Sequence, residues 1–187
     1  MTWPAQKEKD LEEQEQQARF EETIMPHLDA AYNLARWLTR NEHDAQDVVQ
    51  DAFLRAFKFF GGFRGGNSRS WLLSIVRNTT YTWLQKNRKL ELVTVSDEEI
   101  HEIEDTSSNP EVLLLKNSDR QEMMRAVEQL PVEFREALIL RELEGLSYKE
   151  IAEMADVPIG TVMSRLARAR KLLQQSLSLP LEPGASK

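Results

Sequence analysis

The chain has 187 residues, with 31 acidic and 24 basic side chains, a net charge of −7 and no cysteine. This length suits one or two small domains, and the lack of cysteine excludes disulfides and thiolate metal sites. No apolar run reaches the ~18 residues of a membrane span, and the first residues lack the order of a secretory signal, so we expect a cytoplasmic protein without membrane insertion.

Helical periodicity dominates the chain. Residues 1–19 are rich in glutamate and glutamine, which favours a frayed helix or a disordered extension. Apolar side chains then recur at three and four positions over 20–90 and again over 117–178, without the alternation typical of strands. The sequence therefore predicts an all-α chain of two small helical domains.

An acidic ridge marks the predicted helix at 44–57. Asp44, Asp47 and Asp51 follow one another at spacings of three and four residues. The opposite, inward face carries Ala45, Val48, Val49, Ala52 and Ala56. From these residues alone a solvated helix face is the simpler interpretation, because Asp44 lies near the helix N-terminus and Asp51 can pair with Arg55.

A basic, glycine-rich loop precedes the helix predicted over about 70–89. Residues 64–89 contain six basic side chains and no acid: Arg64, Arg69, Arg77, Lys86, Arg88 and Lys89. The outward face of the helix also carries Asn78 and Tyr81. Aromatic and amide groups among cations suit unpaired bases, which can be stacked and hydrogen-bonded along edges hidden in a duplex. For the tryptophans of this helix, core packing is the alternative.

The segment 91–116 is predicted to be an acidic linker. From 91 to 112 it contains acids but no lysine or arginine, and a Ser-Ser-Asn-Pro run follows Thr106. We also expect the proline- and glycine-containing tail, 179–187, to be loose. The linker's acidity is compatible either with a simple spacer or with a mimic of nucleic-acid phosphates.

Residues 145–173 predict a helix-turn-helix, the motif that places its second helix in the major groove of DNA. Tyr148, Ile151 and Ala152 share the inner face of the first helix, and Pro158 stops it, so a second helix begins near Ile159. The inner face of this second helix carries Val162, Leu166, Ala169 and Leu173. Its outward face is small and basic, which suits a close approach to base edges.

Three segments in this order resemble the extracytoplasmic-function (ECF) group of bacterial sigma factors. They are DAQDVVQDAFLRAF (44–57), SWLLSIVRN (70–78) and LPVEFREALILRELEGLSYKEIAEMADVPIGTVMSRLARARKLL (130–173). The resemblance covers about residues 20–178. It implies a region-two domain at 20–90, a region-four domain at 117–178 and no separate domain between them.

The resemblance also implies a role for each surface. The ridge would dock on the clamp helices of the largest subunit of RNA polymerase through Asp44, Asp47, Gln50 and Asp51. The minus-ten element would be captured as unpaired bases by Phe63, Arg64, Asn67, Ser68, Arg69, Arg77, Asn78 and Tyr81. The minus-thirty-five element would be contacted by Thr161, Met163, Ser164, Ala167, Arg168 and Lys171. Met163 and Ala167 depart from the family's usual residues, which places the bases read here in question.

The remaining implications concern partners and chemistry. The helix before the motif would meet the polymerase flap, the linker would enter the path of the growing RNA, and an anti-sigma protein would cover both domains. We expect no enzyme activity, cofactor or metal, since His27, His43 and His101 lack metal-ligand spacing and no phosphate loop is present. Two alternatives remain: a polymerase-independent helix-turn-helix regulator and a helical adaptor that binds only proteins.

Overall fold

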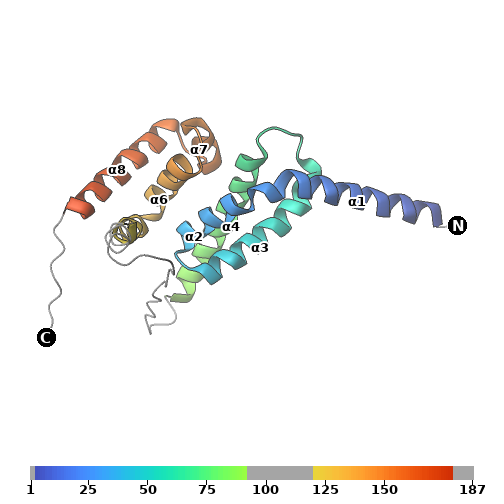
Figure 1. Cartoon of the computed structure of the whole chain (residues 1–187), viewed down its shortest axis with the longest axis horizontal. Coiled ribbons are helices and arrows are strands. Elements are labelled where there is room, and N and C mark those ends of the chain that lie inside the picture. The colour runs from blue at the N-terminus through green and yellow to red at the C-terminus, as the bar shows by residue number, and fades with distance from the viewer. Residues whose placement is uncertain (1–2, 92–119, 179–187) are drawn as a thin grey trace, which may run out of the picture.

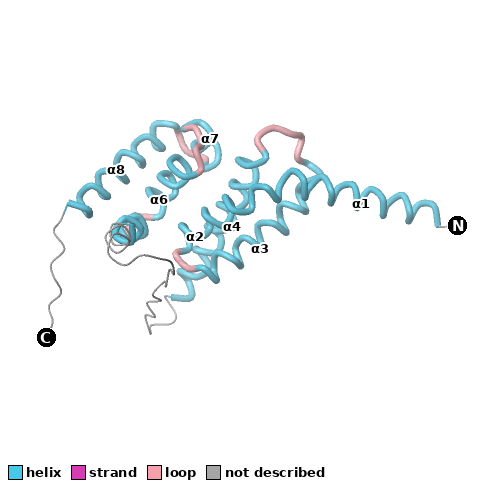
Figure 2. Tube along the Cα trace, viewed as in Figure 1, coloured by secondary structure: helices cyan, strands magenta, loops and turns pink. Residues whose placement is uncertain are grey.

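The structure, a computed structural model, describes the backbone of residues 3–91 and 120–178 and the side chains of residues 13–87 and 120–177. Within these ranges every regular element is a helix (Figure 2). The helices form two groups that lie side by side, α1–α4 and the C-terminal group that ends with α8 (Figure 1). The predicted all-α class is confirmed, whereas most of the predicted linker and the tail lie outside the described residues.

The N-terminal domain is a bundle of three helices with a fourth laid against it. A long helix, α1 (Trp3–Ile24), leads through a 3₁₀ turn (Met25–His27) into α2 (Leu28–Thr39), α3 (Glu42–Phe59) and α4 (Ser68–Glu91). Helices α2, α3 and α4 each pack against the other two. The buried side chains between them include Leu34, Leu38, Val48, Leu72, Leu73 and Val76. Val48, Leu72 and Val76 thus lie on the inner faces of amphipathic helices.

Helix α1 extends beyond the bundle, and its first turns project away from the other helices (Figure 1). Its C-terminal end is anchored by Phe20, whose ring meets those of Phe53, Phe57 and Phe60 edge to face. Edge-to-face contacts place the positive ring edge on a negative ring face. Residues 3–24 are thus helical, where the sequence left helix and disorder open for residues 1–19.

The C-terminal domain contains the helix-turn-helix. A helix over 120–128 precedes α6 (Val132–Leu138), a π-helical segment η3 (Ile139–Leu143), α7 (Tyr148–Ala155) and α8 (Ile159–Ser178). Helix α8 packs on both α6 and α7. The buried residues of this domain include Leu140, Ile151, Val162, Leu166 and Ala169. Both helices of the predicted motif are confirmed, with boundaries at the expected residues.

The two domains are in direct contact. Helix α2 packs on α6, α4 packs on α7, and the buried apolar side chains of both domains form one contiguous cluster. The buried Arg135 of α6 reaches across and donates to the carbonyl oxygen of Leu38 at 3.3 Å. Nothing in the periodicity of the separate helices indicates this contact, because it joins residues almost a hundred positions apart.

Candidate polymerase and nucleic-acid interfaces

The acidic ridge of α3 lies at the surface. Asn41 caps the helix by accepting a hydrogen bond from the backbone N–H of Asp44 at 3.1 Å, which fixes the start of the ridge. Asp47, Gln50 and Asp51 are exposed, and Asp44 is half-buried. Partial burial, together with the charge of Asp47, raises the pKa of Asp44. The four predicted polymerase-docking residues therefore share one accessible face with a concentrated negative charge.

An apolar hollow lies beside this ridge, between α2 and α3. Its volume is about 470 Å³, and its apolar lining comes from Leu28, Tyr32, Val49 and Phe53. Gln50 belongs both to the hollow and to the predicted docking residues. The hollow was not predicted, because it arises where two amphipathic helices meet and belongs to the periodicity of neither.

The loop before α4 is shaped by its glycines. Gly65 and Gly66 adopt φ values of +88° and +100°, which side-chain-bearing residues rarely take. The loop then ends at Asn67, whose side-chain oxygen caps α4 by accepting from the N–H of Ser70 at 3.0 Å. Phe63 stacks on Phe60 and is half-buried. Two of the predicted minus-ten residues, Phe63 and Asn67, thus also hold the loop in place.

Further along α4, side chains predicted to face solvent instead meet the C-terminal domain. Arg77 forms an ion pair with the carboxylate of Glu136, and the Tyr81 hydroxyl donates to the same carboxylate at 2.8 Å. The guanidinium carbon of Arg77 also lies 4.5 Å from the centroid of the Tyr81 ring. The helical period identified the correct face of α4, but a second domain covers much of it.

The same pattern continues at the N-terminal end of α4. Arg69 pairs with the carboxylate of Glu144 and donates to its backbone carbonyl as well. Asn67 and Ser70 both donate to Glu150, at 2.9 Å and 3.0 Å. Ser68 contacts His27 at 2.9 Å, within the N-terminal domain. Of the eight predicted minus-ten residues, Arg64, Asn67 and Asn78 are exposed and the other five are half-buried.

The carboxylates at this contact differ in burial. The side chains of Glu136 and Glu144 are only 1% and 3% exposed. Burial raises the pKa of Glu144, although the Arg69 guanidinium opposes that effect. Burial and the adjacent Glu136 charge raise the pKa of Tyr81, so its hydroxyl remains a hydrogen-bond donor. At Glu136 and Glu144 the contact therefore consists of desolvated, charge-assisted hydrogen bonds, whereas the hydrogen bond from Asn67 to Glu150 is exposed.

Helix α7 begins with a capping box. Ser147 accepts from the N–H of Glu150 at 3.2 Å, and Glu150 accepts from the N–H of Ser147 at 2.9 Å. The Ser147 hydroxyl also donates to the Glu150 carboxylate, and the two hydrogen bonds that Ser147 donates to it are the largest cause of the lowered pKa of Glu150. Asp156 ends α7 in the left-handed region, at φ 53°, and Pro158 precedes α8. This turn places α8 across α7, as a DNA-reading second helix requires.

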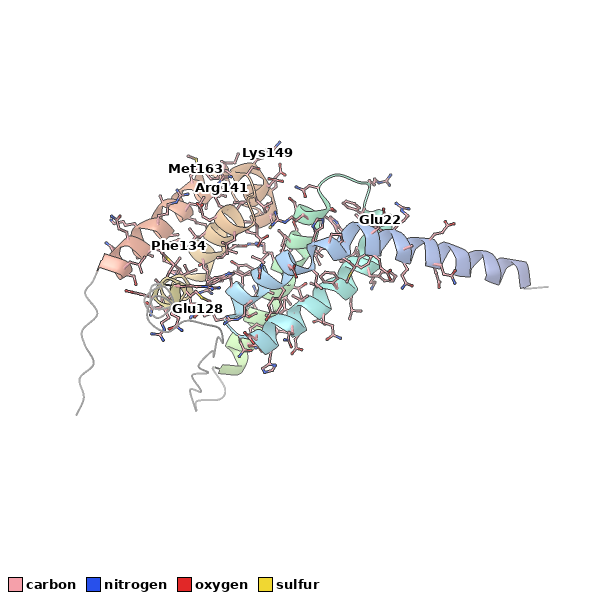
Figure 3. The ribbon with its side chains drawn as sticks, viewed as in Figure 1. Glu22, Glu128, Phe134, Arg141, Lys149 and Met163 are labelled. Atoms are coloured by element: carbon pink, nitrogen blue, oxygen red, sulfur yellow. The ribbon has the colours of Figure 1, made fainter. Side chains whose placement is uncertain are left out.

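The outward face of α8 is open. Its exposed residues are Met163, Ser164, Ala167, Arg168 and Lys171, and Thr161 is half-buried. Met163 lies on the side of α8 away from the N-terminal domain (Figure 3). Ser164 donates to the carbonyl of Thr161 at 2.9 Å, which leaves its lone pairs outward. All six predicted minus-thirty-five residues lie on the first four turns of this helix.

Arg170 is an exposed residue of α8 beside the six predicted minus-thirty-five residues. In the structure Arg170 pairs with Glu142 at 2.7 Å. The important residues that the sequence did not reveal are Glu136, Glu144 and Glu150. Glu136 lies in α6, Glu144 directly follows η3 and Glu150 lies in α7, all in ordinarily charged stretches of sequence. Only the domain contact gives them their partners in the N-terminal domain.

The described residues contain no cluster of three or more histidine, cysteine, aspartate or glutamate side chains able to hold a metal ion. Of the histidines considered from the sequence, His101 lies outside these residues. None of the described helices combines the length and apolar character needed to cross a membrane.

Comparison with known proteins matches both domains. The family model described as Sigma-70 region 2 matches residues 23–90, and the one described as Sigma-70, region 4 matches residues 120–173. The chain is 40% identical to the ECF RNA polymerase sigma-E factor of Escherichia coli K12, over 72% of this chain and 74% of that protein. It is 31% identical to the ECF RNA polymerase sigma factor SigE of Mycolicibacterium smegmatis, over 85% of this chain and 62% of that protein.

A solved structure shares the arrangement of the helices. The sigma factor RpoE of Bartonella quintana, in complex with the anti-sigma factor NepR, superimposes with a TM-score of 0.68 at 29% identity. The match covers 87% of this chain and 98% of the RpoE chain. The likeness therefore includes both helical domains.

Proposed function

Since the chain belongs to the ECF sigma factors of the sigma-70 family, we propose that it uses three separate surfaces to direct transcription initiation. Members of this family bind core RNA polymerase and promoter DNA, and they are initiation factors rather than enzymes. The proposal assigns polymerase docking to α3, minus-ten capture to α4 with its preceding loop, and minus-thirty-five reading to α8. It divides the chain into a region-two domain at 20–90, a linker at 91–116 and a region-four domain at 117–178.

Polymerase docking rests on the acidic ridge. Asp44, Asp47, Gln50 and Asp51 present a negative face to a partner with opposite potential, which guides encounter and fixes register. The neighbouring apolar hollow supports this assignment, because a docking site needs apolar contact as well as charge. We place the complex in the cytoplasm, where bacterial transcription takes place.

Minus-ten capture rests on the strand-capture set, the name used below for Phe63, Arg64, Asn67, Ser68, Arg69, Arg77, Asn78 and Tyr81. These residues combine guanidinium, amide and aromatic groups along one face of α4 and its loop. Such groups bind phosphates, base edges and base faces, respectively. Flipping a base costs a few kcal/mol, so the pocket selects the bases whose contacts compensate for that cost.

Minus-thirty-five reading rests on α8. Small exposed residues such as Ser164 and Ala167 allow the helix to enter the major groove, while Arg168 can donate to guanine or phosphate. Thr161 and Lys171 lie nearby for backbone contacts. We propose an anti-sigma protein as the regulator, because the similar Bartonella sigma factor is bound to one.

The single observation that carries the proposal is the presence of a basic-aromatic helix face and a DNA-type helix-turn-helix in one chain. The test is transcription from a library of start sites by core polymerase freed of sigma factors, with and without the purified protein. We expect a new, reproducible set of transcripts that share two promoter elements. A regulator would require another sigma factor, and an adaptor would yield no new transcript; either result would refute the proposal.

A further inference from the structure

The C-terminal domain occupies much of the strand-capture set. Glu136 binds Arg77 and Tyr81, Glu144 binds Arg69, and Glu150 binds Asn67. We propose that this closed arrangement is autoinhibitory: the C-terminal domain uses these three carboxylates to exclude the minus-ten strand until the domains separate. The inference rests on the proposed function, because it assumes that the strand-capture set binds DNA.

The carboxylates at the contact offer the same kind of hydrogen-bond acceptors as the phosphates of a nucleic acid. A guanidinium binds carboxylate and phosphate oxygens with the same forked geometry, so Arg69 and Arg77 cannot serve both at once. The Tyr81 hydroxyl and the Asn67 amide are engaged by the same acids. In addition, the Arg77 guanidinium lies over the Tyr81 ring at 4.5 Å, where a base would stack. Strand capture and closure therefore compete for the same atoms.

The π-helical segment brings two of the acids into line. The N–H of Glu144 donates to the carbonyl of Ile139, five residues back, at 3.0 Å. On a regular α-helix, side chains eight residues apart point about 80° apart, whereas taking up one extra residue reduces this to about 20°. Glu136 and Glu144 can thus both face α4. A π-helical turn is uncommon, and here it aligns the acids with their partners.

The closed arrangement also carries a cost that permits opening. Arg135 is 1% exposed, and its guanidinium donates to the carbonyls of Glu128, Leu130 and Leu38, with no carboxylate among these partners. Its Nε finds no acceptor among the described residues. Burial lowers the pKa of Arg135 to about 10. Burying a charge without a counterion costs free energy, so closure is compatible with release by a binding partner.

The test uses the full chain and its lack of native cysteine. Cysteines replacing Lys58 on α3 and Gln175 on α8, both exposed, accept a donor and an acceptor dye that report domain separation. The key variant is E136Q, which removes the charge that binds Arg77 and Tyr81 without changing any proposed DNA-binding residue. The control is E133Q, the same charge change at an exposed position of α6. The DNA probe is a random single-stranded pool of about 12 nucleotides.

We expect E136Q to lower energy transfer and to bind the DNA pool at least about tenfold more tightly, as when a minor open state becomes the main one. The control should match the unsubstituted chain in both measurements. Unchanged energy transfer in the variant, or opening without tighter DNA binding, would overturn the inference.

A second measurement needs no glutamate variant. Because coupling is reciprocal, saturating DNA should lower energy transfer in the dye-labelled chain that keeps Glu136 and Glu144. DNA that binds without a change in transfer would overturn autoinhibition. Neither result depends on start-site selection, which tests the proposed function separately with core polymerase.

Discussion

The two proposed DNA-binding surfaces are presented in opposite ways. On α4, Arg77 and Tyr81 meet a buried carboxylate of the other domain, whereas on α8 the face that includes Ser164, Ala167 and Arg168 is open to solvent. Both faces follow the same helical period and carry the same kinds of side chain. The difference shows that a helix's own pattern identifies its outward face, while the placement of the domains determines whether that face is free.

The carboxylates explain why only one surface is covered. Glu136 and Glu144 project from the C-terminal domain toward α4, and their burial requires a cation on the opposing helix. On α8 the corresponding neutralisation is local, since Arg170 pairs with Glu142 of its own domain. Strand capture therefore depends on domain separation, and the open face of α8 does not.

The largest expected effect separates the inner and outer faces of α8. Leu166 is 1% exposed and Met163 is 53% exposed. Leu166→Ala should lower the free energy of unfolding by about 2–5 kcal/mol, because it leaves a cavity in the helix-turn-helix core. Met163→Ala should change it by no more than about 0.5 kcal/mol. Urea denaturation followed by circular dichroism measures both, and equal losses would contradict the orientation of α8.

The acidic ridge extends the comparison to a third face, which is open like that of α8. Asp47→Lys combined with Asp51→Lys should weaken association with core polymerase by about tenfold or more, because it reverses the docking field. Glu21→Lys with Glu22→Lys, at exposed positions of α1, makes the same charge change elsewhere. Co-purification and fluorescence titration with core polymerase provide the measurement. If the two double variants bound core polymerase equally well, the ridge would be only a solvated helix face.

Much of this architecture follows from the sequence, and the exceptions have a common cause. Val162, Leu166 and Ala169 are buried as their spacing predicts, because local periodicity fixes which side of a helix is apolar. The helical period predicts the correct face of α4 for Arg77 and Tyr81, but it also predicts that this face meets solvent. Their cover comes from Glu136, more than fifty residues away, and no local pattern encodes such a contact. The π-helical segment was missed for a related reason, since tertiary packing decides where one extra residue is taken up.

A smaller effect is expected at the open DNA surface. Arg168→Ala removes an exposed guanidinium from α8 and should reduce promoter discrimination by about 1–3 kcal/mol. Core-polymerase binding and domain separation should stay unchanged, because Arg168 lies on the open face. Gln175→Ala, exposed on a later turn of α8, is the matched control. Competition between promoter and mutated promoter in transcription assays measures the effect. An unaltered promoter preference would remove Arg168 from the reading face.

The smallest expected effect is on the pKa values of Glu144 and Glu150. Titration separates a shift caused by the domain contact from one caused within α7. Against an ordinary value of 4.5, burial raises the pKa of Glu144, whereas hydrogen bonds from Ser147 chiefly lower that of Glu150. The Glu144 contribution to closure is therefore complete below pH 4.5 and is lost as the pH rises through its raised pKa. The Glu150 contribution is chiefly to the cap of α7; it is present above pH 4.5 and is lost as the pH falls through its lowered pKa.

Carboxyl-carbon NMR of the full chain should show these opposite displacements. In a chain opened by E136Q, the pKa of Glu144 should return toward 4.5, because opening removes α4 and its Arg69 from beside the carboxylate and admits water. The pKa of Glu150 should remain lowered, since the capping box of α7 persists without the contact. If both pKa values returned together, the cap would depend on closure. If neither moved while energy transfer reported opening, the burial of Glu144 would originate within its own domain.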